Sequence, residues 1–138
     1  MKSKTLLFII LLSTIHYKPS TILAYADTLN RAASLYLQGS YSESINQCGI
    51  NIARDNSPDS ALYLAGLNFL RINDVEKARE KLTRVMDNFK SSRYLEAAKL
   101  AYADTFFMEQ DYAKAGQLYE DALKADSKKV GTQGQEID

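Results

Sequence analysis

The side chains that most often perform chemistry in proteins are sparse in this sequence. Its only histidine is His16, which lies in a segment that we interpret below as a signal peptide. Without His16, the mature chain has no imidazole for a nucleophile–base pair, for acid–base catalysis or for a metal site. The only cysteine, Cys48, falls at an inward position of a predicted helix. We expect a buried structural thiol there, with an intermolecular disulfide as the alternative, since export can be oxidising.

The carboxylates and the loops add no catalytic or ligand-binding motif. Glu76 with Glu80, and Glu120 with Asp121, lie on predicted helix surfaces, where such carboxylates are usually solvated. Glu80 and Arg84 have the i,i+4 spacing of an ordinary helical ion pair. The sequence has no glycine-rich phosphate loop and no calcium-binding run of Asp and Asn. We therefore expect a protein that is not an enzyme and that binds no metal or cofactor.

The charge distribution argues against nucleic acid as a partner. The chain carries 17 basic and 17 acidic side chains. Residues 1–26 contain Lys2, Lys4 and Lys18 but no acidic residue, so the remainder has 14 basic and 17 acidic side chains, a net charge of −3. A nucleic-acid-binding protein needs a basic face that displaces the counterions of the phosphates. The nine tyrosines are not interleaved with basic residues, so we assign them to packing.

Residues 1–26 have the organisation of a secretory signal peptide. Lys2 and Lys4 precede an apolar run at residues 6–15, and residues 24–26 (Ala-Tyr-Ala) form a small-x-small cleavage site. The apolar run is ten residues long, whereas a membrane-spanning helix needs about 20. We therefore expect an exported protein. The alternative is an uncleaved segment that anchors the chain in the membrane.

A short pattern recurs three times in the rest of the chain. Each copy has a polar turn, a bulky residue, two mostly polar residues and a small residue. The copies are residues 39–44, 73–78 and 110–115. The small residues Ser44 and Ala78 are 34 positions apart, and Ala78 and Ala115 are 37 apart. Apolar residues recur at three- and four-residue spacing on both sides of each turn, which predicts three helix pairs.

We predict an all-α fold with six helices, none of which contains an internal proline. The predicted helices are residues 27–38, 42–54, 58–72, 75–89, 92–108 and 112–125. They form three repeats at about 27–56, 58–91 and 92–128, and residues 129–138 have no apolar period and are expected to be a flexible tail. Small residues are expected where helices approach closely, and these are Gly66, Ala78, Ala103 and Ala115.

These units resemble the tetratricopeptide repeat family over about residues 27–128, which is nearly all of the mature chain. The phrase at residues 88–98 and the 37-residue spacing resemble the repeats of bacterial envelope proteins, such as outer-membrane assembly lipoproteins and the Tol–Pal coordinator family. The chain has Lys90 where those repeats usually have proline, and Ser44 where alanine is usual. The resemblance implies a right-handed superhelical array of three antiparallel helix pairs and a periplasmic scaffold for protein assembly. It does not identify the partner.

In such an array the first helix of each pair lines the inner face, which is where a partner would bind. By register, that concave face carries Leu29, Ala33, Tyr36 and Leu37, then Tyr63, Leu67, Leu70 and Arg71, then Leu100, Asp104, Phe107 and Met108. This surface is apolar with only two charges, so it suits an amphipathic helix or an apolar peptide. Packing against the chain's own helices or a second copy is the alternative, because apolar stripes at helical spacing usually form core.

The sequence thus favours an exported, non-catalytic adaptor that binds a protein or peptide. The last helix carries Leu118, Tyr119, Ala122 and Leu123, although such arrays normally close with a polar capping helix. Two alternatives therefore stay open. One is a structural protein that associates with copies of itself, and the other is the N-terminal accessory region of a longer envelope enzyme.

Overall fold

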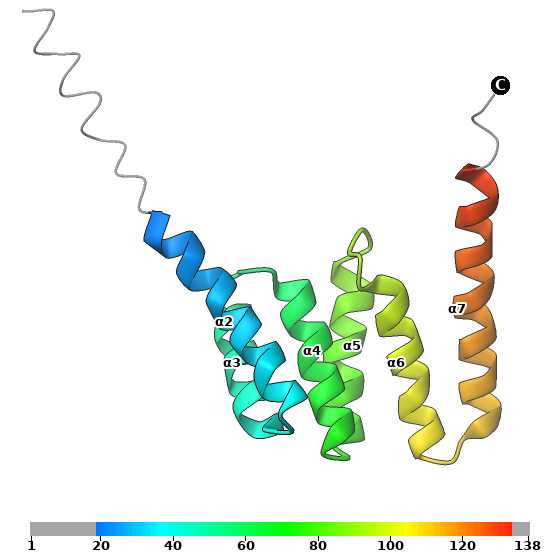
Figure 1. Ribbon diagram of the computed structural model, residues 1–138. Helices are drawn as coiled ribbons and strands as arrows, with labels where there is room; N and C mark the ends of the chain where they lie inside the picture. Colours follow the sequence, from blue (N-terminus) through cyan, green and yellow to red (C-terminus); the bar gives the residue numbers. More distant parts are fainter. Residues whose placement is uncertain (1–18, 134–138) are drawn as a thin grey trace, which may run out of the picture.

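The computed structural model describes the backbone of residues 19–133 and the side chains of residues 28–124. Over this range the chain forms α-helices and no strand, which confirms the all-helical class (Figure 1). The helices are α2 (Pro19–Leu37), α3 (Tyr41–Ala53), α4 (Pro58–Arg71), α5 (Val75–Asn88), α6 (Leu95–Met108) and α7 (Tyr112–Gln133). Each helix packs against the next one along the chain, and α4 also contacts α2 and α6.

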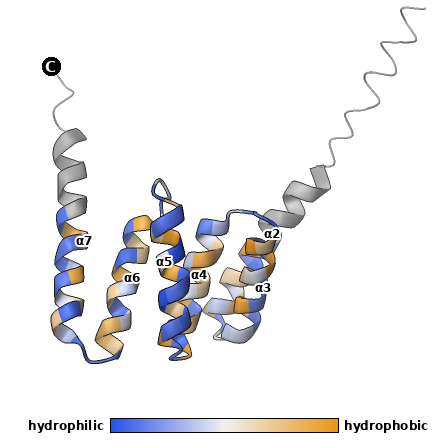
Figure 2. Cartoon of the chain, turned by 180° about the vertical axis from the view of Figure 1, so that it is seen from behind, coloured by the Kyte–Doolittle hydropathy of each residue, from blue (hydrophilic) through white to orange (hydrophobic). Residues whose placement is uncertain are grey.

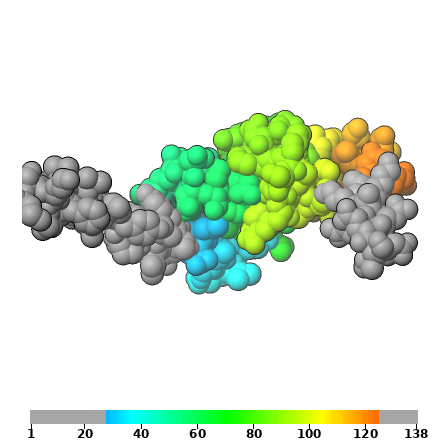
Figure 3. Space-filling model, turned by 90° about the horizontal axis from the view of Figure 1, so that it is seen from above, coloured from blue at the N-terminus to red at the C-terminus, as the bar shows by residue number. Residues whose placement is uncertain are grey.

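The helices follow one another along the length of the molecule. Seen from above, the described residues run from α2 at one end to α7 at the other (Figure 3). Helices α2, α4 and α6 lie in front in Figure 1, whereas α3 and α5 are nearest the viewer in Figure 2. Within the described part of the chain, the backbones of α3 and α5 do not come close to one another, and neither do those of α5 and α7. The molecule therefore has a face formed by α2, α4 and α6 and an opposite face formed by α3 and α5.

The two outer helices are longer than the sequence pattern predicts. Helix α2 begins at Pro19, so residues 19–26 of the expected signal peptide are helical, and residues 1–18 lie outside the described range. Helix α7 continues to Gln133, so residues 129–133 of the expected tail are also helical, and residues 134–138 lie outside. Residues 124–130 contain neither proline nor glycine, and lysine and alanine are good helix formers, so nothing in this stretch ends the helix.

Three turns of the same geometry join the helices of each pair. In each turn the third residue after the helix donates its backbone N–H to a carbonyl five residues earlier, over 2.9 Å. These bonds join Ser40 to Leu35, Asp74 to Phe69 and Asp111 to Phe106. The preceding residues Gly39, Asn73 and Gln110 have φ angles of 80°, 60° and 65°, the left-handed conformation that ends many helices in this way. The turns lie at the three predicted positions.

Helix starts after these turns are capped as the sequence suggests at two of three sites. The Asp74 carboxylate accepts from the N–H of Lys77 at 3.2 Å, and Asp111 accepts from Lys114 at 3.1 Å. Ser40 stands before α3 but makes no side-chain cap. Ser40 and Glu43 have the sequence spacing of a capping box, but the Ser40 side chain does not form it.

The core consists of small residues around a few large ones. One cluster joins α2, α3, α4 and α5 through Ala32, Cys48, Ala65, Phe69 and Ala78, and a second joins α4, α5 and α6 through Leu62, Leu82, Val85, Ala98 and Ala101. The predicted packing residues Ala78, Ala103 and Ala115 are at most 1% exposed. A Cβ atom at Gly66 would lie 2.7 Å from Leu82 Cδ2. Only glycine therefore lets α4 and α5 pack at this distance.

Candidate binding groove between α2, α4 and α6

A groove of about 520 Å³ lies on the face formed by α2, α4 and α6. Seven residues line it: Tyr36 from α2, Leu67, Leu70 and Arg71 from α4, and Asp104, Phe107 and Met108 from α6. All seven belong to the concave face expected from the sequence. The two longer walls are equivalent in the repeat, because residues 67, 70 and 71 become 104, 107 and 108 after a shift of 37 positions. The i, i+3, i+4 spacing places each set on one side of its helix.

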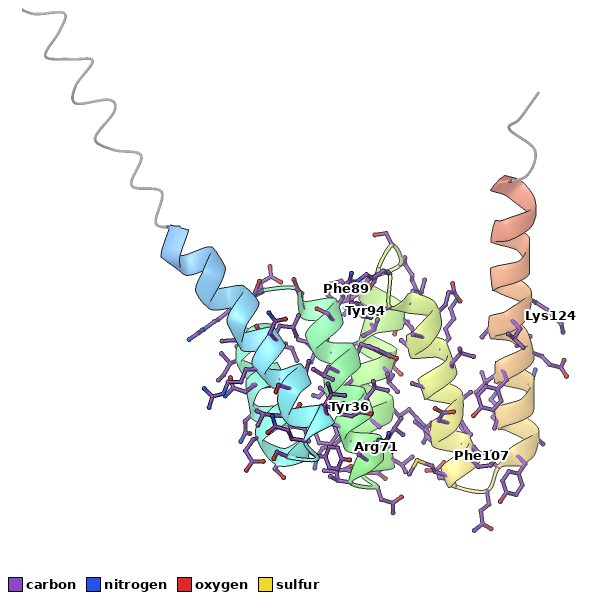
Figure 4. The ribbon with its side chains drawn as sticks, in the orientation of Figure 1. Tyr36, Arg71, Phe89, Tyr94, Phe107 and Lys124 are labelled. Atoms are coloured by element: carbon purple, nitrogen blue, oxygen red, sulfur yellow. The ribbon has the colours of Figure 1, made fainter. Side chains whose placement is uncertain are left out.

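The base and one wall of this groove are apolar and partly open to solvent. Phe107 is 56% exposed and Met108 is 38% exposed, although both are large apolar residues. The Phe107 ring is held edge-on against Tyr112, with the ring centroids 5.2 Å apart. Figure 4 shows Phe107 at the C-terminal end of α6, beside the turn into α7. Leu67 and Leu70 are half-buried, because both pack against the second core cluster. Leu70 also packs against the first core cluster.

A cation lies at the α2 side of the groove and an anion on the α6 side. Arg71 donates from Nε to the Tyr36 hydroxyl at 3.1 Å, and its guanidinium lies 5.8 Å from the centroid of the same ring (Figure 4). The hydrogen bond to Tyr36 raises the pKa of Arg71 above its ordinary value. Asp104 accepts a 2.5 Å hydrogen bond from the Tyr119 hydroxyl of α7. Burial, and then Asp104, raise the pKa of Tyr119 to about 12, so the phenol remains a donor at neutral pH.

Tyr63 borders the groove without lining it. Its ring stacks on Tyr94, with the centroids 5.3 Å apart and the planes inclined by 24°. Burial raises the pKa of Tyr63, and the nearby Tyr36, Asp104 and Tyr94 raise it further. Tyr63 lies one helical turn before Leu67 on α4. Among the expected residues, Tyr63 links the groove to the N-terminal end of α6.

The remaining expected residues lie away from the groove. Leu100, one turn before Asp104, is 39% exposed, and Leu37 is 83% exposed at the end of α2. Leu29 and Ala33 are half-buried in α2. The groove thus occupies the C-terminal half of the predicted face, and the Tyr63–Tyr94 stack joins α4 to the start of α6 beyond it.

Two residues at this site were not among those expected from the sequence, namely Tyr119 and Tyr94. Tyr119 was assigned only to the packing of α7, yet its hydroxyl holds Asp104. The two helices of a pair run antiparallel, so residues at similar distances from the turn come close together. Asp104 and Tyr119 lie on either side of the turn at Gln110 and Asp111, and this position is the signal that could have revealed the contact.

Cys48, the one residue with a thiol, lies outside the groove and is held in its protonated form. Cys48 is fully buried in the first core cluster, and this burial raises the pKa of its thiol to about 11. The described residues include no group of three or more Cys, His, Asp or Glu side chains arranged to hold a metal ion. None of the described helices combines the length and apolar character required to cross a membrane.

Comparison with known proteins gave no relative for this arrangement. No family model matches the sequence, and no curated protein or solved structure matches the chain.

Proposed function

We propose that this chain is a non-catalytic scaffold of three tetratricopeptide-like helix pairs, which binds a segment of a protein partner. Three turns with the same hydrogen bonds, spaced 34 and 37 residues apart, support a repeated unit. Backbone contacts of α4 with both α2 and α6, but none between α3 and α5 in the described chain, support a stack that curves toward the face of α2, α4 and α6. A right-handed superhelix is the arrangement that this family resemblance implies.

The observation that carries the proposal is the groove between α2, α4 and α6. It combines four apolar side chains with one cation and one anion, so it can orient a ligand that is mainly apolar. Phe107 is exposed at its edge and can be covered by a partner. An amphipathic helix or a short apolar peptide fits this chemistry, because its apolar face would cover Leu67, Leu70 and Phe107 while polar groups meet Arg71 and Asp104.

The experiment introduces a charge into the groove and compares the captured partners. We expect Phe107→Arg and Leu67→Arg to lose the proteins that the native chain captures from its own cells. Ile50→Arg is the matched control, because Ile50 is 37% exposed on α3 and does not line the groove. Circular dichroism would show that each variant keeps its helices. An unchanged set of captured proteins with both groove variants would contradict the proposal.

The proposal also includes export to a bacterial periplasm. This part rests on the sequence of residues 1–26 and on the family resemblance. The mass of the chain recovered from the producing cells tests it. Cleavage after residue 26 would leave Asp27 as the first residue. Recovery of the intact chain from the cytoplasm would contradict export, and recovery of the intact chain with the membrane would support the anchored alternative.

Self-association is a second candidate, favoured by the exposed end of the array. Leu123 is 63% exposed on α7, close to a smaller apolar pocket of about 240 Å³ that Ala122 and Leu118 help to line. In a longer array this surface would be covered by the next helix. Sedimentation velocity tests this candidate, which predicts a dimer or larger species that Leu123→Glu converts to a monomer. A native chain that stays monomeric at high concentration would exclude it.

A further inference from the structure

A second groove lies on the opposite face of the molecule, between α3 and α5. Its volume is about 410 Å³. Ala65 and Phe69 of α4 form its floor, where they are one helical turn apart. In the view from behind, α3 and α5 flank α4 on this face (Figure 2). We call this site the convex groove, and none of its lining residues lines the groove between α2, α4 and α6.

The α3 wall of the convex groove is apolar and runs for about two helical turns. Ile45, Gly49 and Ile52 line it at i, i+4 and i+7, a length of about 10 Å at the helical rise per residue. Gly49 is exposed, and a Cβ atom placed on it would meet no other atom within 4 Å. The absent side chain therefore widens the groove without being required by the packing of the chain itself.

All the charged residues that line the convex groove are positive, and both are on the α5 wall. Lys81 bonds to the neighbouring Glu80 carboxylate at 2.9 Å, and its side chain is only 21% exposed because it lies along the groove. Glu80 was expected to pair with Arg84, but among the described residues the structure pairs it with Lys81 instead. Arg84 has no ion pair within the described part of the chain and is exposed.

The positive wall is specific to this junction between helix pairs. The equivalent position to Arg84 in the next repeat is Asp121, since 84 plus 37 is 121. Asp121 lines the smaller pocket between α5 and α7, which is the counterpart of the convex groove. If the fold required a positive charge at this position of the repeat, residue 121 would also be basic. The charge of Arg84, which has no ion pair in the described part of the chain, is therefore available for recognition.

We propose that the convex groove binds an amphipathic helix with an apolar face and with acidic residues along the flank next to α5. The apolar face would cover Phe69, Ile45 and Ile52, and the acidic flank would meet Arg84, because the Lys81 ammonium is already bonded to Glu80. A helix fits better than a lipid acyl chain, because the groove is open beside exposed residues such as Asn46 and Gly49 rather than enclosed. This site is separate from the proposed partner groove, so the chain could hold two segments at once on opposite faces.

The test uses two fluorescent helical peptides with the same leucine stripe. One carries glutamates along one flank, and the other carries lysines at those positions. Binding to the full chain is measured by fluorescence anisotropy. We expect the glutamate peptide to bind at least about tenfold more tightly than the lysine peptide, and its affinity to fall with added salt, because the charges at the rim are exposed to solvent.

Two variants locate this binding, and each has a matched control. Gly49→Trp fills the groove, whereas Gly116→Trp adds the same side chain at another open helical glycine that lines none of the described grooves. Arg84→Glu reverses the charge of the wall, whereas Arg54→Glu changes the net charge equally outside the groove. We expect Gly49→Trp to abolish binding and Arg84→Glu to reverse the preference toward the lysine peptide, with both controls unchanged.

Several outcomes would overturn the inference. Equal affinity for the two peptides, or no saturable binding of the glutamate peptide, would refute the role of the positive wall. Binding that survives Gly49→Trp would place the peptide elsewhere. Binding of phosphatidylglycerol vesicles in preference to the peptide, with loss in Gly49→Trp, would assign the groove to a lipid surface. A native dimer that Gly49→Trp dissociates would assign it to a second copy of the chain.

Discussion

Gly66 shows how a single missing side chain sets the distance between two helices. A Cβ atom there would lie 2.7 Å from Leu82 Cδ2 and 2.8 Å from Leu82 Cγ. Leu82 is fully buried in the second core cluster, so it has no free space into which to move. The glycine is therefore explained by packing of α4 against α5, even though glycine is a poor helix former.

We predict that Gly66→Ala lowers the free energy of unfolding by about 1–3 kcal/mol, because the methyl group overpacks a filled core. Urea denaturation followed by circular dichroism measures the change. Gly116→Ala is the control, since a Cβ atom there meets nothing within 4 Å. The control should gain up to about 1 kcal/mol from the better helix propensity of alanine. A stabilised Gly66→Ala variant would show that α4 and α5 are not in close contact.

Cys48 provides a prediction on the dependence of stability on pH. Burial raises the pKa of its thiol from the ordinary value of 9.0 to about 11 in the folded chain. Below pH 9 the thiol is protonated in both states and has no effect. Between pH 9 and 11 the unfolded chain loses the proton first, which favours unfolding, so the free energy of unfolding falls as the pH rises through this range.

The measurement compares urea denaturation of the native chain and of Cys48→Ala at several pH values. We expect the stability of the native chain to fall more steeply than that of the variant between pH 9 and 11. The buried thiol should also react with a thiol reagent only after unfolding, since the thiolate is the reactive form. Rapid modification of the folded chain at neutral pH would contradict this placement of Cys48.

At the scale of the elements, the three left-handed turn residues are not equally suited to their positions. Gly39 adopts its φ of 80° without steric cost, whereas Gln110 has a side chain at a φ of 65°. Nothing lies within 4 Å of a Cβ atom on Gly39, so its requirement is one of backbone conformation only. The sequence pattern locates these turns because polar residues interrupt the apolar period there.

We predict that Gln110→Gly raises the free energy of unfolding by about 0.5–1 kcal/mol, because it removes the strain of a side chain in the left-handed region. Gly39→Ala should have the opposite effect, of about 1 kcal/mol. Thermal unfolding of both variants measures these changes. A destabilised Gln110→Gly chain would mean that the Gln110 side chain makes a stabilising contact that outweighs its strain.

One arginine adds polar contacts to the apolar junction of α5 and α6. Arg79 donates to Thr105 Oγ1 at 3.1 Å and to the Glu109 carboxylate at 2.7 Å, and its guanidinium lies 4.3 Å from the centroid of the Phe106 ring. Its side chain is 27% exposed, so solvent weakens these interactions only in part. Arg79 of α5 thus joins the second helix pair to the third, because its guanidinium forms hydrogen bonds with α6 and its C-cap and also stacks on an aromatic ring of α6.

At the scale of the molecule, stability is expected to differ along the array. Helix α4 contacts four other helices, whereas α7 contacts only α6 among the described helices. In arrays of this type, each element is stabilised mainly by its nearest neighbours. Local unfolding should therefore begin at the α7 end and reach the centre last.

Hydrogen exchange measured by mass spectrometry tests this expectation. We predict the slowest exchange in α4 and α5, faster exchange in α6 and the fastest in the described part of α7. Gly66→Ala should increase exchange in α4 and α5 more than in α7, because the disturbed packing lies between the first two. Uniform protection of all helices, with a uniform increase in the variant, would instead indicate a single cooperative unit.

The sequence by itself determined the helices of the central part, the turns between them and one shared helix face. The apolar period and the spacing of 34 and 37 residues locate α3 to α6 closely, because they depend only on neighbours along the chain. They also relate residues 67, 70 and 71 to 104, 107 and 108. Where the pattern ends, as in α2 and α7, the predicted boundaries were too short.

Only the tertiary structure decided which side chains of different helices meet. Helical register gives the direction of a side chain around its own axis, but the distance and crossing of two helices follow from how their side chains interlock. Tyr119 therefore reaches Asp104, and Arg79 reaches Glu109, through contacts that the period does not contain. The pairing of Lys81 rather than Arg84 with Glu80, and with it the positive wall of the convex groove, was decided in the same way.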